Sequence, residues 1–181
     1  MRHEVFMSGL GGQGIMLAGQ VLAQAAMDAG LQVSWFPSYS PEVRGGEANC
    51  TVVLSDERVG SPITGSPGTV LLMAPVAVDA YLKDCAPGGL AIINSGLGPV
   101  QITRDDVRIV MIDANALAIQ AGGERLANMA MLGAWIGLVR PELLDAAVGA
   151  LKTVLPERHH KWIPANAEAM RLGAAAAASA P

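Results

Sequence analysis

The feature that most constrains how this chain can fold is a glycine-rich hexapeptide near its start, Gly9-Leu10-Gly11-Gly12-Gln13-Gly14. It satisfies the pattern G-x-G-x-x-G, and it lies between an apolar run at residues 4–8 and a helical pattern at residues 15–29. Glycines allow a tight turn, and the free N–H groups at the start of a helix attract an anion. The motif therefore predicts either a turn that binds a phosphate or carboxylate, or a turn required only for close helix–strand packing.

Apolar runs and helical patterns alternate along the rest of the chain. Further strands are predicted at residues 31–36, 48–55, 69–73, 90–93 and 108–112, and helices at 76–85, 124–139, 141–155 and from 164 onward. Such alternation is typical of βαβ units, and continuous apolar runs indicate strands that are buried on both faces. We therefore predict an α/β fold with a Rossmann-like, open, mainly parallel sheet, helices on both faces and a helical C-terminal part.

The length of 181 residues suits a single domain. No internal repeat or long linker divides the chain, so residues 1–173 are predicted as one α/β domain. The alanine-rich segment 174–181 is predicted to be a disordered tail.

Composition narrows the class of partner. Charged residues make up only 15% of the chain, against about a quarter in ordinary globular domains. This indicates either a surface partly covered by partner chains or simply an alanine- and glycine-rich sequence. The net charge of −4, without a basic run, argues against nucleic-acid binding. No apolar stretch approaches the roughly 20 residues of a membrane span, so a cytoplasmic location is expected.

A dinucleotide site would need a second element besides the glycine-rich turn. An acidic residue about 20 positions further on, at the end of the second strand, holds the ribose of NAD. The corresponding segment, Gln32-Val33-Ser34-Trp35-Phe36-Pro37, contains neither an acid nor an arginine for a 2′-phosphate. The turn is thus suited to an anion, while binding of NAD lacks its second support.

A second segment, at residues 37–47, follows the second predicted strand as a loop and should reach the same edge of the sheet as the turn. Its Arg44, beside two glycines, suits a phosphate or carboxylate, or else pairs with a neighbouring glutamate. Asn94 follows a later strand and either lines the same crevice or makes a simple turn. The candidate ligand- or interface-binding residues are Gly9, Gly11, Gly12, Gln13, Gly14, Ser38, Tyr39, Glu42, Arg44, Gly45, Gly46 and Asn94.

No catalytic or metal-binding residue is predicted in this chain. Cys50 and Cys85 are far apart in apolar surroundings, so each is predicted to be a buried structural thiol rather than a ligand of an iron–sulfur cluster or zinc. The run His159-His160-Lys161 lacks a third metal ligand. Because no nucleophile, acid or base can be assembled, the isolated chain is expected to be inactive and to work as a subunit.

Two long motifs carry a resemblance to a known family. The glycine-rich turn matches G-x-G-G-Q-G, and residues 38–46 match Ser-Tyr-Gly-Pro-Glu-x-Arg-Gly-Gly, with Ser40 in place of the usual glycine. Segments 47–55, 60–62, 125–133 and 156–160 add to the likeness. The chain resembles the gamma subunit of the 2-oxoacid:ferredoxin oxidoreductases, and its late segments look most like the 2-oxoglutarate branch.

This resemblance implies a reaction and a set of partners. Such enzymes oxidatively decarboxylate a 2-oxoacid with CoA as co-substrate, giving acyl-CoA, CO₂ and reduced ferredoxin. Thiamine diphosphate, Mg²⁺ and [4Fe-4S] clusters are expected on the partner alpha and beta subunits, and ferredoxin is expected as electron acceptor of the complex. The gamma domain is expected to pack against the thiamine-binding chains and to help receive CoA. Two alternatives stay open: a free-standing Rossmann-type nucleotide-binding oxidoreductase, and a module that binds CoA or a nucleotide without turnover.

Overall fold

A computed structural model of the chain describes residues 1–39, 46–61 and 65–180. It contains one six-stranded sheet in the order β2-β3-β1-β4-β5-β6. The strands are β1 (Arg2–Leu10), β2 (Gln32–Tyr39), β3 (Glu47–Ser55), β4 (Thr69–Leu72), β5 (Leu90–Asn94) and β6 (Arg108–Ile112). Strand β3 is antiparallel to both its neighbours, β1 and β2, and the other five strands run in one direction. The predicted α/β fold with a mainly parallel sheet is confirmed.

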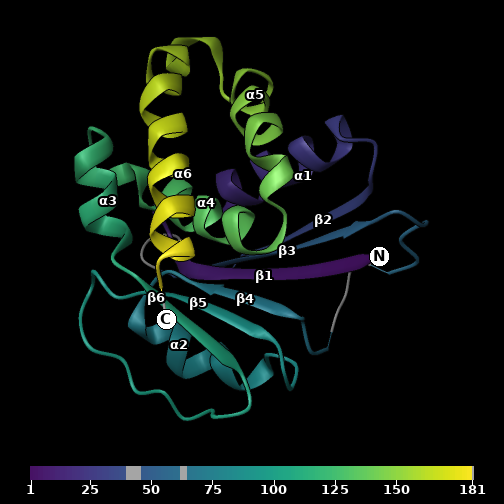
Figure 1. Cartoon of the computed structure of the whole chain (residues 1–181), viewed down its shortest axis with the longest axis vertical. Helices are drawn as coiled ribbons and strands as arrows, with labels where there is room; N and C mark the ends of the chain where they lie inside the picture. Colours follow the sequence, from purple (N-terminus) through teal and green to yellow (C-terminus); the bar gives the residue numbers. More distant parts are fainter. Residues whose placement is uncertain (40–45, 62–64, 181) are drawn as a thin grey trace.

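Helices cover both faces of this sheet, as predicted (Figure 1). They are α1 (Ile15–Asp28), α2 (Pro75–Tyr81), α3 (Ala114–Ala121), α4 (Ala127–Val139), α5 (Leu144–Val154) and α6 (Ile163–Ala178). Short 3₁₀ turns join them: η1 (Leu82–Asp84), η2 (Glu124–Leu126), η3 (Pro141–Leu143) and η4 (Glu157–Trp162). Helix α2 lies on one face, while α1, α4, α5 and α6 lie on the other. None of the helices in the described ranges is long and apolar enough to cross a membrane.

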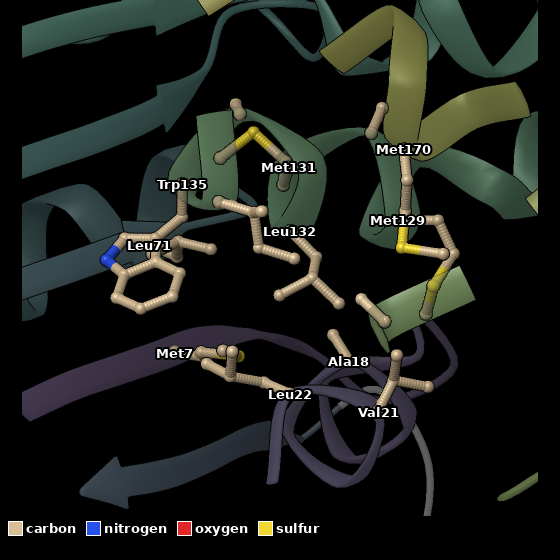
Figure 2. Packing of buried hydrophobic residues seen from close by; sticks show 14 of the residues in the cluster. Met7, Ala18, Val21, Leu22, Leu71, Met129, Met131, Leu132, Trp135 and Met170 are labelled. Atoms are coloured by element: carbon tan, nitrogen blue, oxygen red, sulfur yellow. The ribbon is translucent and has the colours of Figure 1, made fainter. Parts of the chain in front are cut away.

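The larger core lies between the sheet and α4. Figure 2 shows Met7 of β1, Leu22 of α1 and Trp135 of α4 facing one another there. Residues 127–136 of α4 are all buried, because the sheet lies on one side of this helix and α6 on the other. The smaller core joins Val70 and Leu72 to α2. Since strand side chains alternate between faces, burial on both faces accounts for the continuous apolar runs of the sequence.

Helices α4 and α6 approach closely through glycine. A Cβ atom added at Gly133 would lie 2.0 Å from the carbonyl oxygen of Met170, and one added at Gly173 would lie 1.9 Å from that of Ala130. Real Cβ atoms essentially never come within 3.0 Å of such an atom. The absence of a side chain at both positions therefore sets the distance between the two helices.

Two expectations about element boundaries are wrong. Pro37, Ser38 and Tyr39 belong to β2 rather than to a loop, and they pair with Cys50, Asn49 and Ala48 of β3. Proline is tolerated there because β2 is an edge strand. The alanine-rich tail is not disordered over residues 174–178, which continue α6. Alanine is the strongest helix former, and Ala177 is only 1% exposed within the larger core.

Candidate functional site

The glycine-rich turn follows β1 at the carboxyl edge of the parallel strands, and hydrogen bonds between Gln13 and Leu10 hold it closed. The side-chain Oε1 of Gln13 accepts a hydrogen bond from the backbone N–H of Leu10 at 2.7 Å. The backbone N–H of Gln13 donates to the carbonyl of Leu10 at 3.1 Å. Gly12 and Gly14 have φ angles of 94° and 76°, in the left-handed region that glycine adopts without strain. Gly14 then caps α1 without a side chain.

The glycines of the turn divide by what surrounds them. A Cβ at Gly9 would lie 2.9 Å from Met73 Cβ, and one at Gly14 would lie 2.4 Å from Nδ2 of Asn128. The same Asn128 Nδ2 donates to the carbonyl of Gly14 at 3.0 Å. Gly12, in contrast, has nothing within 4 Å of its Cβ position. Gly9 and Gly14 are therefore required for packing, and Gly12 is the position that a ligand can approach.

The end of the second candidate segment reaches this turn. The backbone N–H of Gly11 donates to the carbonyl of Gly46 at 2.8 Å, as expected from the shared edge of the sheet. Ser38 is exposed near the end of β2, and Tyr39 pairs through its backbone with Ala48. The remaining candidates of this segment, Glu42, Arg44 and Gly45, lie outside the described residues.

Asn94 holds loops together at the carboxyl edge. It is 1% exposed, and its Nδ2 donates to the carbonyl of Met73 at 3.2 Å and to Oδ1 of Asn115 at 2.8 Å. Its Oδ1 accepts from the backbone N–H groups of Gly96 and Ala114, both at 3.1 Å. All four hydrogen-bonding positions of the amide are used. Asn94 thus joins the segments that follow β4 and β5 to the start of α3.

A cavity of about 230 Å³ opens between these elements, beside the ends of β1 and β4 where the strand order changes direction. Open α/β sheets bind ligands at such a point. The cavity, here called the crevice, is lined by Gly12, Gln13, Met73, Asn94, Leu97, Asn115, Glu124, Arg125 and Ala127. Sequence reasoning identified three of these residues, Gly12, Gln13 and Asn94, as site candidates.

Arg125 is the crevice residue that sequence reasoning missed and that matters most for an anion. It lies in η2, is exposed, and makes no hydrogen bond or ion pair within the described part of the chain. Its guanidinium is free to meet a phosphate or carboxylate. Arg125 begins the family-like stretch 125–133, but no local pattern shows that this stretch reaches a turn more than one hundred residues earlier.

The strand order bears on nucleotide binding. In dinucleotide-binding folds, the second strand lies beside the first and brings its acidic residue next to the glycine-rich turn. Here β3 separates β1 from β2, which places the end of β2 two strand spacings, about 10 Å, from β1. Both the missing acid and this separation argue against an NAD site of the usual geometry.

A polar cluster on the α2 face anchors the start of β3. The Tyr81 hydroxyl donates to Oε2 of Glu47 at 2.5 Å and accepts from Nδ2 of Asn49 at 2.9 Å. Burial, and then the hydrogen bond to Glu47, raise the pKa of Tyr81 above its usual value. The phenol therefore stays protonated and joins α2 to the strand that follows Gly46.

The family of the chain follows from comparison with known proteins. The sequence model described as pyruvate ferredoxin/flavodoxin oxidoreductase matches residues 4–176. The chain belongs to this family. The crystal structure of the keto/oxoacid ferredoxin oxidoreductase gamma subunit from Geobacter sulfurreducens shares its fold, with a TM-score of 0.84 and 29% identity over 100% of this chain and 99% of that one. The predicted resemblance to the gamma subunits is confirmed.

Relatives in the pyruvate ferredoxin/flavodoxin oxidoreductase family differ in length and in substrate name. Ketoisovalerate oxidoreductase subunit VorA of Methanothermobacter marburgensis is 37% identical over 135 residues, which cover 75% of this chain but only 28% of VorA. 2-Oxoglutarate synthase subunit KorC of the same organism is 32% identical over 167 residues, 86% of this chain and 88% of KorC. The 2-oxoglutarate:ferredoxin oxidoreductase from Magnetococcus marinus shares the fold at a TM-score of 0.84 and 22% identity, over 98% of this chain and 31% of that chain.

The cysteines of this family member do not fit an iron–sulfur cluster. Cys50 packs in the larger core and Cys85 in the smaller one, on opposite faces of the sheet. Both are free and buried, as predicted, and burial raises the pKa of the Cys50 thiol to about 12 and also raises that of Cys85. Within the described ranges, no three His, Cys, Asp or Glu side chains gather in a group that could hold a metal ion.

Proposed function

We propose that this chain is the gamma subunit of a thiamine-diphosphate-dependent 2-oxoacid:ferredoxin oxidoreductase. The complex oxidatively decarboxylates a 2-oxoacid and transfers the acyl group to CoA, while two electrons pass to ferredoxin. The observation that carries the proposal is the family match over residues 4–176, together with nearly complete two-way coverage of a gamma-subunit structure. In this proposal the alpha and beta subunits hold thiamine diphosphate, Mg²⁺ and the [4Fe-4S] clusters, and within the described ranges of this chain no three His, Cys, Asp or Glu side chains gather in a group that could hold a metal ion.

Within that complex, the crevice helps to receive CoA. Gly12 and Gln13, which line the crevice, directly precede α1, whose first turn has no side-chain cap and no acidic residue. Arg125 also lines the crevice, and it has no ion-pair partner among the described residues. Such donors suit the pyrophosphate and ribose phosphate of CoA. Arg44 of the second motif is proposed to meet the same ligand. In this proposal the chain contributes binding and orientation, and its Tyr81 hydroxyl is engaged with Glu47 and Asn49 outside the crevice.

The favoured substrate is 2-oxoglutarate. KorC, whose name includes 2-oxoglutarate synthase, aligns with this chain over 86% of one and 88% of the other. VorA is slightly more identical but matches over a shorter stretch. A cytoplasmic location belongs to the same proposal, and the two free thiols support a reducing compartment.

The first experiment compares the isolated chain with the assembled complex. The complex should reduce a viologen dye in the presence of CoA and a 2-oxoacid, tested with 2-oxoglutarate, pyruvate and 3-methyl-2-oxobutanoate, and 2-oxoglutarate should give the highest kcat/KM. The isolated chain should be colourless and inert with all three. Turnover of NAD(P)H by the isolated chain would instead support a free-standing oxidoreductase, and CoA binding without any active complex would support a binding module.

The second experiment locates CoA. A photo-reactive CoA analogue on the whole complex should label peptides that contain Gly14, Arg44 or Arg125, with protection by excess CoA. Arg44→Ala should raise the KM for CoA about ten- to a hundred-fold, the value of one charge-assisted hydrogen bond, and Arg44→Lys should restore little of it. Labelling confined to the other chains would leave this domain with a purely structural role.

A further inference from the structure

A second cavity, of about 400 Å³, lies beside the crevice on the helical face. It is formed where α1, η2, η4 and α6 meet, and its lining residues are Leu17, Gly122, Gly123, Glu124, Arg125, Leu126, Leu155, His159, Trp162 and Asn166. Its volume lies within the range of about 300–1,000 Å³ that is usual for ligand sites. Nothing in the proposed role of the crevice accounts for this cavity.

The walls of this second cavity are mainly apolar, and its charged or ionisable side chains are Glu124, Arg125 and His159. The backbone N–H groups of Gly122 and Gly123 already donate to Ile119 and Ala118, and that of Leu126 donates to Gly123. Nδ2 of Asn166 donates to the carbonyl of Trp162 at 2.7 Å. Small-molecule sites combine apolar walls with a few free, convergent polar groups. The leucine and glycine part of the wall therefore suits an apolar side chain, while Glu124 and Arg125 also line the crevice.

The rim of the cavity has the composition of a binding hot spot. Trp162 is 47% exposed there, although it is a large apolar side chain, and Arg125 stands on the ridge shared with the crevice. Tryptophan and arginine are the residue types most enriched at the centres of protein–protein interfaces. The two cavities are adjacent, because Glu124 and Arg125 line both of them.

We propose that the second cavity receives a large apolar or aromatic side chain from a partner polypeptide of the oxidoreductase complex. This inference rests on the proposed function, which supplies that partner. It agrees with the relatives: this chain matches only 28% of VorA and 31% of the Magnetococcus chain, so in both the domain is joined to further polypeptide. The docked partner fills the second cavity, while the guanidinium of Arg125 stays available to the crevice. The partner also excludes water from one side of Arg125, which strengthens the attraction between the guanidinium and an anion.

Two substitutions test the proposal on the whole complex. Gly123→Leu starts from the cavity wall at a position with no atom within 4 Å of its Cβ and with an extended φ of 169°, so it occupies space without backbone strain. Trp162→Ala removes part of the rim. Each should weaken binding of this chain to the remaining subunits at least ten-fold in Kd. The matched controls are Gly149→Leu, also with no atom within 4 Å, and Met27→Ala, 51% exposed on α1; both should stay within two-fold.

Hydroxyl-radical footprinting of the unmodified protein keeps the test independent of the stability of the variants. Oxidation of Trp162, measured by mass spectrometry, should fall several-fold when the chain enters the complex. Equal oxidation of Trp162 in the free chain and the complex would overturn the inference, as would wild-type affinity in both cavity variants. Failure of the unmodified chain to join an active complex would instead count against the proposed function itself.

Discussion

Replacing Gly173 with alanine should destabilise the protein, whereas the same replacement at Gly149 should stabilise it. Both glycines lie inside helices, Gly173 in α6 and Gly149 in α5. At Gly173 the new Cβ would lie 1.9 Å from the carbonyl oxygen of Ala130, a backbone atom of the neighbouring helix that cannot rotate away. At Gly149 the new Cβ would meet nothing within 4 Å. The two variants therefore make the same chemical change and differ only in the room available for the new methyl group.

The magnitudes follow from two opposing effects. Alanine gains about 1 kcal/mol over glycine in a helix interior. Overpacking a close contact costs about 1–3 kcal/mol, and an immovable backbone obstacle places Gly173→Ala near 3 kcal/mol. The expected result is a net loss of about 2 kcal/mol for Gly173→Ala and a gain of about 0.5–1 kcal/mol for Gly149→Ala. For a chain of this size the changes in Tm are about −4 to −8 °C and +1 to +4 °C.

Thermal and urea unfolding, followed by circular dichroism, measure both changes on the same chain. Gly133→Ala, which faces Met170 across the same contact at 2.0 Å, should behave like Gly173→Ala. If Gly173→Ala raised the Tm as Gly149→Ala does, the helices would have room to separate, and the argument that glycine sets their distance would be wrong.

Three further predictions test other parts of the structure. Asn94→Ala leaves the N–H groups of Gly96 and Ala114 without their acceptor, so urea unfolding should show a loss of about 2–5 kcal/mol, and a loss below 1 kcal/mol would contradict this role. Burial, followed by the charges of Arg140 and the terminal amine, lowers the pKa of His3. The unfolded chain therefore binds more protons than the folded one, so the free energy of unfolding should fall as the pH falls from 7.5 to 5.5. This dependence on pH should be weaker in His3→Gln. Cys50, with a pKa of about 12, should resist a thiol reagent at pH 8 until the protein unfolds, and rapid labelling of the native chain would show that its burial is not maintained.

Local patterns sufficed for the class of fold. Runs such as Thr69–Leu72 and Leu90–Asn94 are apolar throughout because both faces of these strands are covered, and burial on two faces leaves this signature in the sequence itself. The glycine-rich turn was likewise correctly placed between β1 and α1, since its left-handed conformations at Gly12 and Gly14 require glycine. Features that depend on a few neighbouring residues could therefore be read directly.

The sequence predicted the ends of two elements wrongly, because contacts between distant residues decide where these elements end. Residues 37–39 contain proline and serine, which favour a turn, yet pairing with β3 overrides that preference at the edge of the sheet. Residues 174–178 look like a low-complexity tail, yet burial of Ala177 against the core extends α6. In both places a long-range contact outweighs the local preference.

By itself, the sequence determined the alternation of strands and helices, the buried character of the sheet and the position of the glycine-rich turn, because each depends on residues close together along the chain. The tertiary structure alone decided that β3 separates β1 from β2, that the Asn94 amide is fully engaged in holding loops, and that Arg125 shares a cavity with Gly12. These outcomes depend on which surfaces pack together after the chain has folded back on itself, and residues more than one hundred positions apart carry no local pattern that records their meeting.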